Sequence, residues 1–111
     1  MLKLEIRLDE NKIRLEGKYD PEALNQRLVR AFEKEHLDYI PKSDGTLVFV
    51  GRGRANDYGC FGKLITALKR QIWFMDYAEK WIWYNSDGGE DENDFAVEDV
   101  LLFYANRASA A

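Results

Sequence analysis

The sequence predicts an α+β domain in which a single mixed β-sheet packs against about three helices. Apolar residues alternate with charged ones over positions 2–8, which is the period of a strand with one buried face. Over positions 21–35 they recur every three or four residues, the period of an amphipathic helix. With 111 residues, 46% of them hydrophobic, the chain has material for one core. The expected order is β-β-α-β-α-β-α, since strands and amphipathic helices each need an opposite layer.

The first two strands are expected at residues 2–8 and 13–15, because apolar and charged residues alternate in both runs. Two such runs joined by a short polar loop predict a hairpin. A helix is expected over residues 21–35. Its start is indicated by Asp20, which can accept hydrogen bonds from unpaired amides, and by Pro21, which already has helical backbone geometry.

The remaining elements follow from apolar runs, glycine clusters and helical spacing. They are, in chain order, a central strand at 46–50 covered on both faces, a glycine-rich loop at 51–62, a helix at 63–75, a strand at 81–84, and a third helix beginning at Asn93 or Asp94. One globular domain is expected over residues 1–107. The small residues of 108–111 are expected to form a frayed tail.

Negative charge is concentrated in one segment of the chain. The formal net charge is -4, yet residues 86–99 hold seven acids and no Lys or Arg, while the other residues carry 16 bases against 13 acids. Repulsion among so many like charges disfavours folding, so we expect this segment to have a role outside local stability.

Composition also bounds the compartment. No apolar run approaches the ~20 residues that a membrane crossing requires, and the alternating N-terminal residues lack the continuous apolar stretch of a signal peptide. The single cysteine, Cys60, excludes an internal disulfide and a cysteine-rich zinc site. A cytoplasmic protein is therefore expected.

No catalytic or metal-binding motif in the sequence is complete. His36 is the only histidine, and its place near the end of the expected helix is typical of dipole complementarity. Cys60 precedes a helix in a glycine-rich loop, where a thiol pKa can fall, but no base is near it in the sequence. A calcium loop starting at Asp87 would require glycine where Glu92 stands. We expect no enzyme, cofactor or metal; a small enzyme using Cys60 or the glycine loop is an alternative.

The glycine-rich loop supports a second alternative, a nucleic-acid-binding module. A strand, a glycine loop and a helix in this order can hold phosphates on backbone amides. The detailed motifs fail, because Leu64 stands where a Walker loop requires Ser or Thr, and Asn56 stands where a dinucleotide loop requires glycine. The residues that would bind RNA or DNA are Arg52, Arg54, Tyr58, Lys63, Lys69 and Arg70.

The acidic segment and the aromatic residues before it predict a protein-binding site. Six aromatic residues occur between positions 73 and 84, and strand alternation places at least one large ring near the acidic loop. Aromatic anchors rimmed by charge are typical of binding hot spots, and an anionic loop suits a basic partner surface. The expected partner-binding residues are Asp87, Glu90, Asp91, Glu92, Asp94, Glu98, Asp99, Trp83 and Tyr84.

The C-terminal third of the chain resembles a class of small bacterial inhibitors. Trp73, the Trp-Ile-Trp-Tyr-Asn-Ser-Asp run at 81–87, the acidic loop and the apolar run at 95–104 look like the C-terminal part of small immunity proteins encoded beside contact-dependent or polymorphic toxins and bacteriocins. The resemblance implies an inhibitor, monomeric or homodimeric, that covers a cognate toxin, commonly a nuclease, without catalysis of its own. A phage-type inhibitor that mimics nucleic acid through its acidic surface remains an alternative.

Overall fold

The structure is a computed structural model that describes the backbone of residues 1–110 and the side chains of residues 1–105. Within that range, five strands and five helices follow one another as β1 (Leu2–Leu8), α1 (Glu10–Glu16), α2 (Pro21–Glu33), β2 (Asp38–Pro41), β3 (Leu47–Val50), α3 (Asp57–Lys69), α4 (Ile72–Tyr77), β4 (Ala78–Asn85), β5 (Ala96–Asp99) and α5 (Val100–Ala110). The strands form one sheet in the order β2-β3-β1-β4-β5. The α+β class is confirmed, but every neighbouring pair is antiparallel, so the sheet is not mixed.

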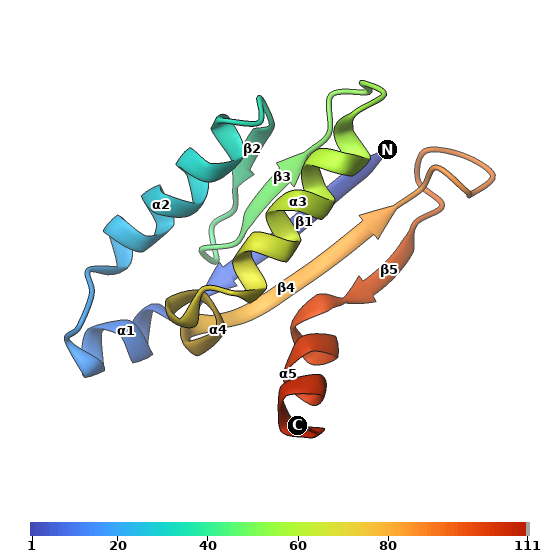
Figure 1. Ribbon diagram of the computed structural model, residues 1–111. Helices are drawn as coiled ribbons and strands as arrows, with labels where there is room; N and C mark the ends of the chain where they lie inside the picture. The colour runs from blue at the N-terminus through green and yellow to red at the C-terminus, as the bar shows by residue number, and fades with distance from the viewer. Residues whose placement is uncertain (111) are drawn as a thin grey trace.

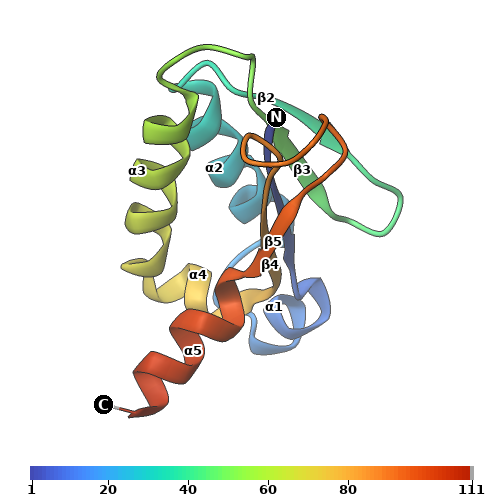
Figure 2. The same ribbon diagram turned by 90° about the vertical axis from the view of Figure 1, so that its right-hand side faces the viewer.

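Helices α2 and α3 lie against one face of the sheet, and the middle of the opposite face carries no helix (Figure 2). On the covered face, the fully buried Leu4 of β1 pairs with Phe49 of β3 on one side and with Trp83 of β4 on the other. The ring of Phe32 on α2 stacks on Phe49 with 3.7 Å between ring centroids. Strand β1 is therefore the middle of both the sheet and the core.

The strand expected at residues 13–15 is wrong, because α1 occupies this part of the chain. Asp9 caps the helix by accepting a hydrogen bond from the Lys12 amide at 3.1 Å. Gly17 ends it with a left-handed φ of 67°, which favours glycine. Ile13 is fully buried while Leu15 is 87% exposed, as a helix requires of residues two apart. The apolar alternation at residues 13–15 was too short to distinguish the two-residue period of a strand from the 3.6-residue period of a helix.

Strand β2 and the beginning of α3 also differ from the expectation. Strand β2, which was not predicted, lies at the sheet edge with all four residues exposed. It begins with Asp and ends with Pro, two residues of low strand propensity, so the sequence gives no strand signal here. Helix α3 begins at Asp57, inside the expected glycine loop, because the buried Phe61, Leu64 and Leu68 at helical spacing outweigh two helical glycines that cost about 1 kcal/mol each. The expected helix at 63–75 is two helices, separated by an extended Gln71.

The last expected helix starts later than predicted. Residues 96–99 form β5, which pairs with β4, and α5 begins only at Val100. Its capping residue is Asp99, whose Oδ1 accepts from the Leu102 amide at 2.9 Å, in place of the predicted Asn93 or Asp94. Helix α5 extends to Ala110, and the last residue of the expected tail at 108–111 lies outside the described residues. Over the described part, no helix has the length and apolar character needed to cross a membrane.

Two alanine substitutions test α1 against the predicted hairpin. Ile13→Ala is expected to lower the free energy of unfolding by about 2–5 kcal/mol, because it empties a fully buried position. Leu15→Ala is expected to change it by less than about 0.5 kcal/mol. Urea unfolding followed by tryptophan fluorescence measures both values. Similar losses at the two positions would mean that both side chains share a buried strand face.

Candidate protein-binding site

The acidic loop, residues 86–95, joins β4 to β5 and projects beyond the end of the sheet (Figure 1). Its base is tied to the start of β1, because the Ser86 amide donates to the Met1 carbonyl at 3.0 Å. Its two sides approach closely at Gly89, where an added Cβ would lie 2.3 Å from the Asp94 carbonyl oxygen. Glycine at position 89 is therefore required for the shape of the loop.

Some loop carboxylates hold the loop together, and others face solvent without a partner. Asp94 accepts from the Glu90 amide at 3.0 Å, and Asp91 accepts from a nearby amide at 2.7 Å. Asp87 forms an ion pair with the amino terminus at 2.6 Å. The carboxylates of Glu90 and Glu92 are exposed and have no hydrogen-bond or ion-pair partner among side chains 1–105.

The other two acids of the predicted site lie on β5. Glu98 and Asp99 are exposed, and Asp99 also caps α5. Apart from Asp87, none of the seven predicted carboxylates has a cation within 4 Å among the described side chains. The structure thus places the acidic surface, which consists of five loop acids and two acids of the edge strand β5, in consecutive segments of the chain.

The two predicted aromatic anchors point to opposite faces of β4. Trp83 is only 8% exposed and packs on Phe61, with 5.0 Å between ring centroids. Tyr84 lies on the face without helices and donates a hydrogen bond to Glu5. Tyr58 is an exposed ring beside Glu98 and Asp99; it meets Trp83 edge-on and was assigned by sequence to the basic patch. Strand alternation alone could not reveal this neighbour from α3.

The Tyr84 hydrogen bond belongs to a network around the buried Glu5 on the sheet face opposite α2 and α3. Glu5 lies 3.4 Å from Lys42 Nζ and 3.7 Å from Lys80 Nζ. Burial raises the pKa of Glu5, but the Tyr84 hydrogen bond and both ammonium groups outweigh burial, so its pKa is lowered. The same hydrogen bond, aided by burial, raises the pKa of Tyr84 to about 12. Tyr84 is therefore held in place within the chain and is not a free anchor.

The glycine loop does not present an open phosphate cradle, because an internal carboxylate occupies it. Asp57, the first residue of α3, is 3% exposed, and its Oδ2 accepts from the amides of Arg52 at 2.7 Å and Arg54 at 3.1 Å. The Arg54 guanidinium lies 3.4 Å from the second oxygen. A Cβ at Gly51 would come within 3.0 Å of the same carboxylate. Gly51 and the amides of Arg52 and Arg54 therefore serve the packing of this loop on Asp57.

The residues proposed for nucleic-acid binding are spread along α3 and the loop before it. Two precede the helix, one lies in its first turn, one at its middle and two at its end: Arg52, Arg54, Tyr58, Lys63, Lys69 and Arg70. Arg52 donates to Asp38 at 3.1 Å, and Lys63 donates to Glu35 at 2.6 Å. The second bond lowers the pKa of Glu35 and raises that of Lys63. Cations already paired within the chain contribute less to binding a phosphate backbone.

Cys60 and His36 form no contact with each other that the structure records. The Cys60 thiol lies 3.7 Å from Glu35 Oε2. His36 follows α2 with a left-handed φ of 59°, and its carbonyl accepts from Arg54 at 3.1 Å. Among the described residues, no group of three or more His, Cys, Asp or Glu side chains is placed to hold a metal ion.

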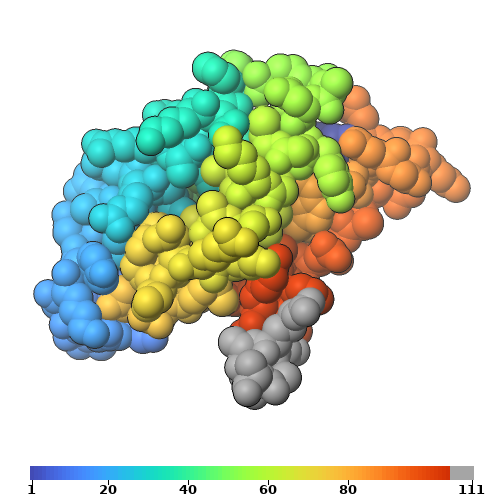
Figure 3. Space-filling model, in the orientation of Figure 1, coloured from blue at the N-terminus to red at the C-terminus, as the bar shows by residue number. Residues whose placement is uncertain are grey.

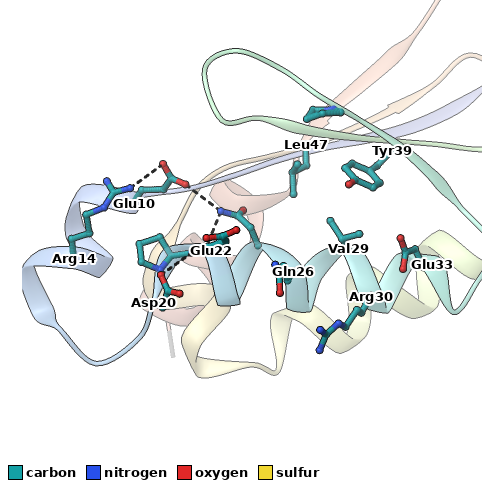
Figure 4. Close-up of a pocket in the computed structure, with 13 residues that line it drawn as sticks. Glu10, Arg14, Asp20, Glu22, Gln26, Val29, Arg30, Glu33, Tyr39 and Leu47 are labelled. Carbon is teal, nitrogen blue, oxygen red and sulfur yellow. Dashed lines mark hydrogen bonds and ion pairs between the residues drawn. The ribbon is translucent and has the colours of Figure 1, made fainter.

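A cavity of about 630 Å³ lies at the other end of the molecule, between α1, α2 and the β2-β3 hairpin (Figure 4). Charges of both signs line it. Glu10 is paired with Arg14 at 3.9 Å and accepts from Asn25 at 3.2 Å. Its lining contains no Ser, Thr, Cys or His, so the side chains in it that could act as a nucleophile or base are carboxylates and the Tyr39 phenol. The acidic surface is the more distinctive site.

Comparisons with known proteins gave no match: no family model, no curated protein and no solved structure matches this chain. The likeness to small immunity proteins therefore stays an expectation. Function has to be argued from the geometry and charges of the residues above.

Removing the Asp57 carboxylate tests its place in the glycine loop. Asp57→Ala is expected to lower the free energy of unfolding by about 2–4 kcal/mol, because two amides and a guanidinium lose their acceptor. Inorganic phosphate should then stabilise the variant more than the native chain, since the vacated amides suit an anion. Thermal unfolding with and without phosphate measures both effects. A variant as stable as the native chain would show that Asp57 does not hold this loop.

Alkaline titration tests the Glu5–Tyr84 bond. The pKa of Tyr84 rises from 10.0 to about 12 on folding, so the bond stabilises the fold fully below about pH 10. That stabilisation is lost as the pH rises from about 10 to about 12. Tyrosinate absorbance should show a late-titrating group that disappears in Tyr84→Phe. If the late group persists unchanged in Tyr84→Phe, it belongs to another residue, such as Tyr77, whose pKa is also raised, and the assignment is wrong.

Proposed function

We propose that this chain is an immunity-type inhibitor that binds a basic surface of a cognate toxin through the acidic loop and β5. The observation that carries the proposal is the projecting loop whose exposed carboxylates, Glu90 and Glu92 above all, have no cation partner among the described side chains. Like charges held close together repel one another in the free chain. A basic partner would relieve that repulsion, so binding such a partner explains why the acids are concentrated in this segment.

The loop is suited to fast and specific association. Complementary charge steers encounter and repels wrong partners. The turn bonds made by Asp91 and Asp94, and the close contact at Gly89, hold the loop in one shape, which lowers the entropy lost on binding. An interface of about 1,200–2,000 Å² is normal for such a complex and would extend from the loop onto neighbouring elements.

A nuclease is the toxin class that this surface suits best, since an enzyme that binds a phosphate backbone needs a cationic groove. The inhibitor would act in the cytoplasm and perform no bond-making step. Nucleic-acid binding by this chain is less favoured, because Arg52, Arg54 and Lys63 are paired within it. A nucleic-acid mimic directed at a host DNA-binding protein would use the same charge complementarity. The two functions are distinguished by the bound partner, which is a toxin for an immunity protein and a DNA-binding protein for a mimic.

Charge reversal in the loop tests the proposal. A basic protein captured from the source cells by the immobilised native chain would be purified, and its association rate measured by stopped flow at low and high salt. Glu90→Lys with Glu92→Lys is expected to slow association roughly tenfold or more at low salt, and high salt should narrow the difference. Co-expression of the native chain should also suppress the toxicity of the captured protein.

The matched control carries the same change in net charge at the other end of the molecule. Glu22→Lys with Glu33→Lys alters two exposed acids of α2 and should slow association far less. Equal rates for the loop variant and the native chain would remove the loop from the mechanism. A captured protein that is harmless to cells would contradict the immunity role.

A further inference from the structure

A groove of about 300 Å³ lies between α3, β5 and the start of α5, next to the acidic surface. Figure 3 views this side of the molecule, with α3 in front and β5 and α5 beside it. Aromatic side chains form its walls and carboxylates stand at its rim; the residues that matter are Tyr58, Trp83, Glu98, Asp99, Phe103 and Tyr104. Trp83, Glu98 and Asp99 were predicted as partner-binding residues and Tyr58 as part of the basic patch, while Phe103 and Tyr104 belonged to neither set.

The groove combines accessible rings with negative charge. Tyr58 is 63% exposed and Phe103 is 52% exposed, while the nearly buried Trp83 closes the groove. Glu98 has no cation partner among the described side chains. Asp99 uses Oδ1 to cap α5 and is otherwise exposed. A ligand in this groove would therefore contact aromatic faces and carboxylates at once.

Internal cations lie over several aromatic rings of the chain, including Tyr104 in the groove. Lys3 lies 4.6 Å from the Phe95 ring centroid, Arg27 lies 5.2 Å from that of Trp73, and Lys69 lies 5.1 Å from that of Tyr104. In the described part of the chain, no cation lies over Tyr58 or Trp83. Lys69, at the Tyr104 wall, forms no ion pair with Glu98 or Asp99. Among the described side chains, Lys69 thus covers the Tyr104 wall of the groove, while Tyr58, Glu98 and Asp99 have no cation partner.

We infer that this groove receives one arginine side chain of the protein partner. The inference rests on the proposed function and names the chemistry of one contact within it. A guanidinium is planar and weakly hydrated, stacks on aromatic rings and pairs with carboxylates through two hydrogen bonds, whereas an ammonium is a strongly hydrated point charge. A volume of about 300 Å³ is at the lower end for small-ligand pockets, which suits a single side chain.

The test uses a small probe and needs no partner. N-acetyl-arginine methylamide would be titrated into the full chain, and NMR shifts followed at the Trp83 indole and at Tyr58 and Phe103. Saturable shifts at millimolar concentrations are expected at these positions. The citrulline analogue, which has the same shape without the charge, should bind at least fivefold more weakly. Equal binding of citrulline, or of the lysine or tetramethylammonium analogue, would overturn the inference.

Variants locate the binding. Glu98→Gln and Tyr58→Ala change exposed side chains, so the fold should be kept, and each should weaken the arginine probe at least fivefold. Glu33→Gln removes one charge from the exposed face of α2, outside the groove and the acidic loop, and should leave the affinity unchanged. Shifts confined to the loop, or no saturable shifts at all, would contradict the groove.

The outcome is separable from that of the proposed function. If the arginine probe fails while loop reversal still slows association with the captured protein, the groove inference falls and the inhibitor proposal stands. If the probe binds the groove but loop reversal leaves the association rate with the captured protein unchanged, the groove is an arginine site. The acidic loop is then not the surface by which the chain binds that protein.

Discussion

Every other part of this structure depends on the pairing of β1 with both β3 and β4. Leu4 and Ile6 are fully buried beneath the helices, and each touches a strand on both sides. A shift of one residue in this register would turn Trp81 and Trp83 outward, away from α3 and into solvent. This register therefore places Trp81 and Trp83 of β4 in the core. It also places the acidic loop, which follows β4, at the end of the sheet.

The fold treats its carboxylates in two different ways. Asp57, Glu5 and Asp44 are each surrounded by donors; the backbone hydrogen bond from Thr46, aided by Arg7, holds the pKa of Asp44 at about 2. Glu92 and Glu98 are displayed without a cation among the described side chains. Acids without a cation partner also occur elsewhere in the described part, as at Glu22 and Glu33 of α2, but the loop and β5 hold six of them in consecutive segments. Their placement favours recognition of a positively charged macromolecule.

The sequence predicted the elements whose periodicity is long or whose boundaries carry strong signals. The seven-residue alternation of β1 and the Asp20-Pro21 start of α2 are examples. It failed where a short apolar pattern fits two periods, as at Ile13 and Leu15, and where tertiary packing overrides glycine, as at the start of α3. The acids of the candidate site were predicted, since charge is legible in a sequence. The pairing of Tyr58 with Trp83 was not, because it joins elements distant along the chain.

The central claim is that the acidic loop and β5 form the surface by which the chain meets a basic partner. Hydrogen–deuterium exchange of the chain, free and bound to the captured protein, tests it most directly. The account predicts slower exchange on binding across residues 86–99 and at the start of α3, with the α2-β2 side unchanged. Protection confined to α2 and β2, with the loop exchanging as fast as in the free chain, would contradict it.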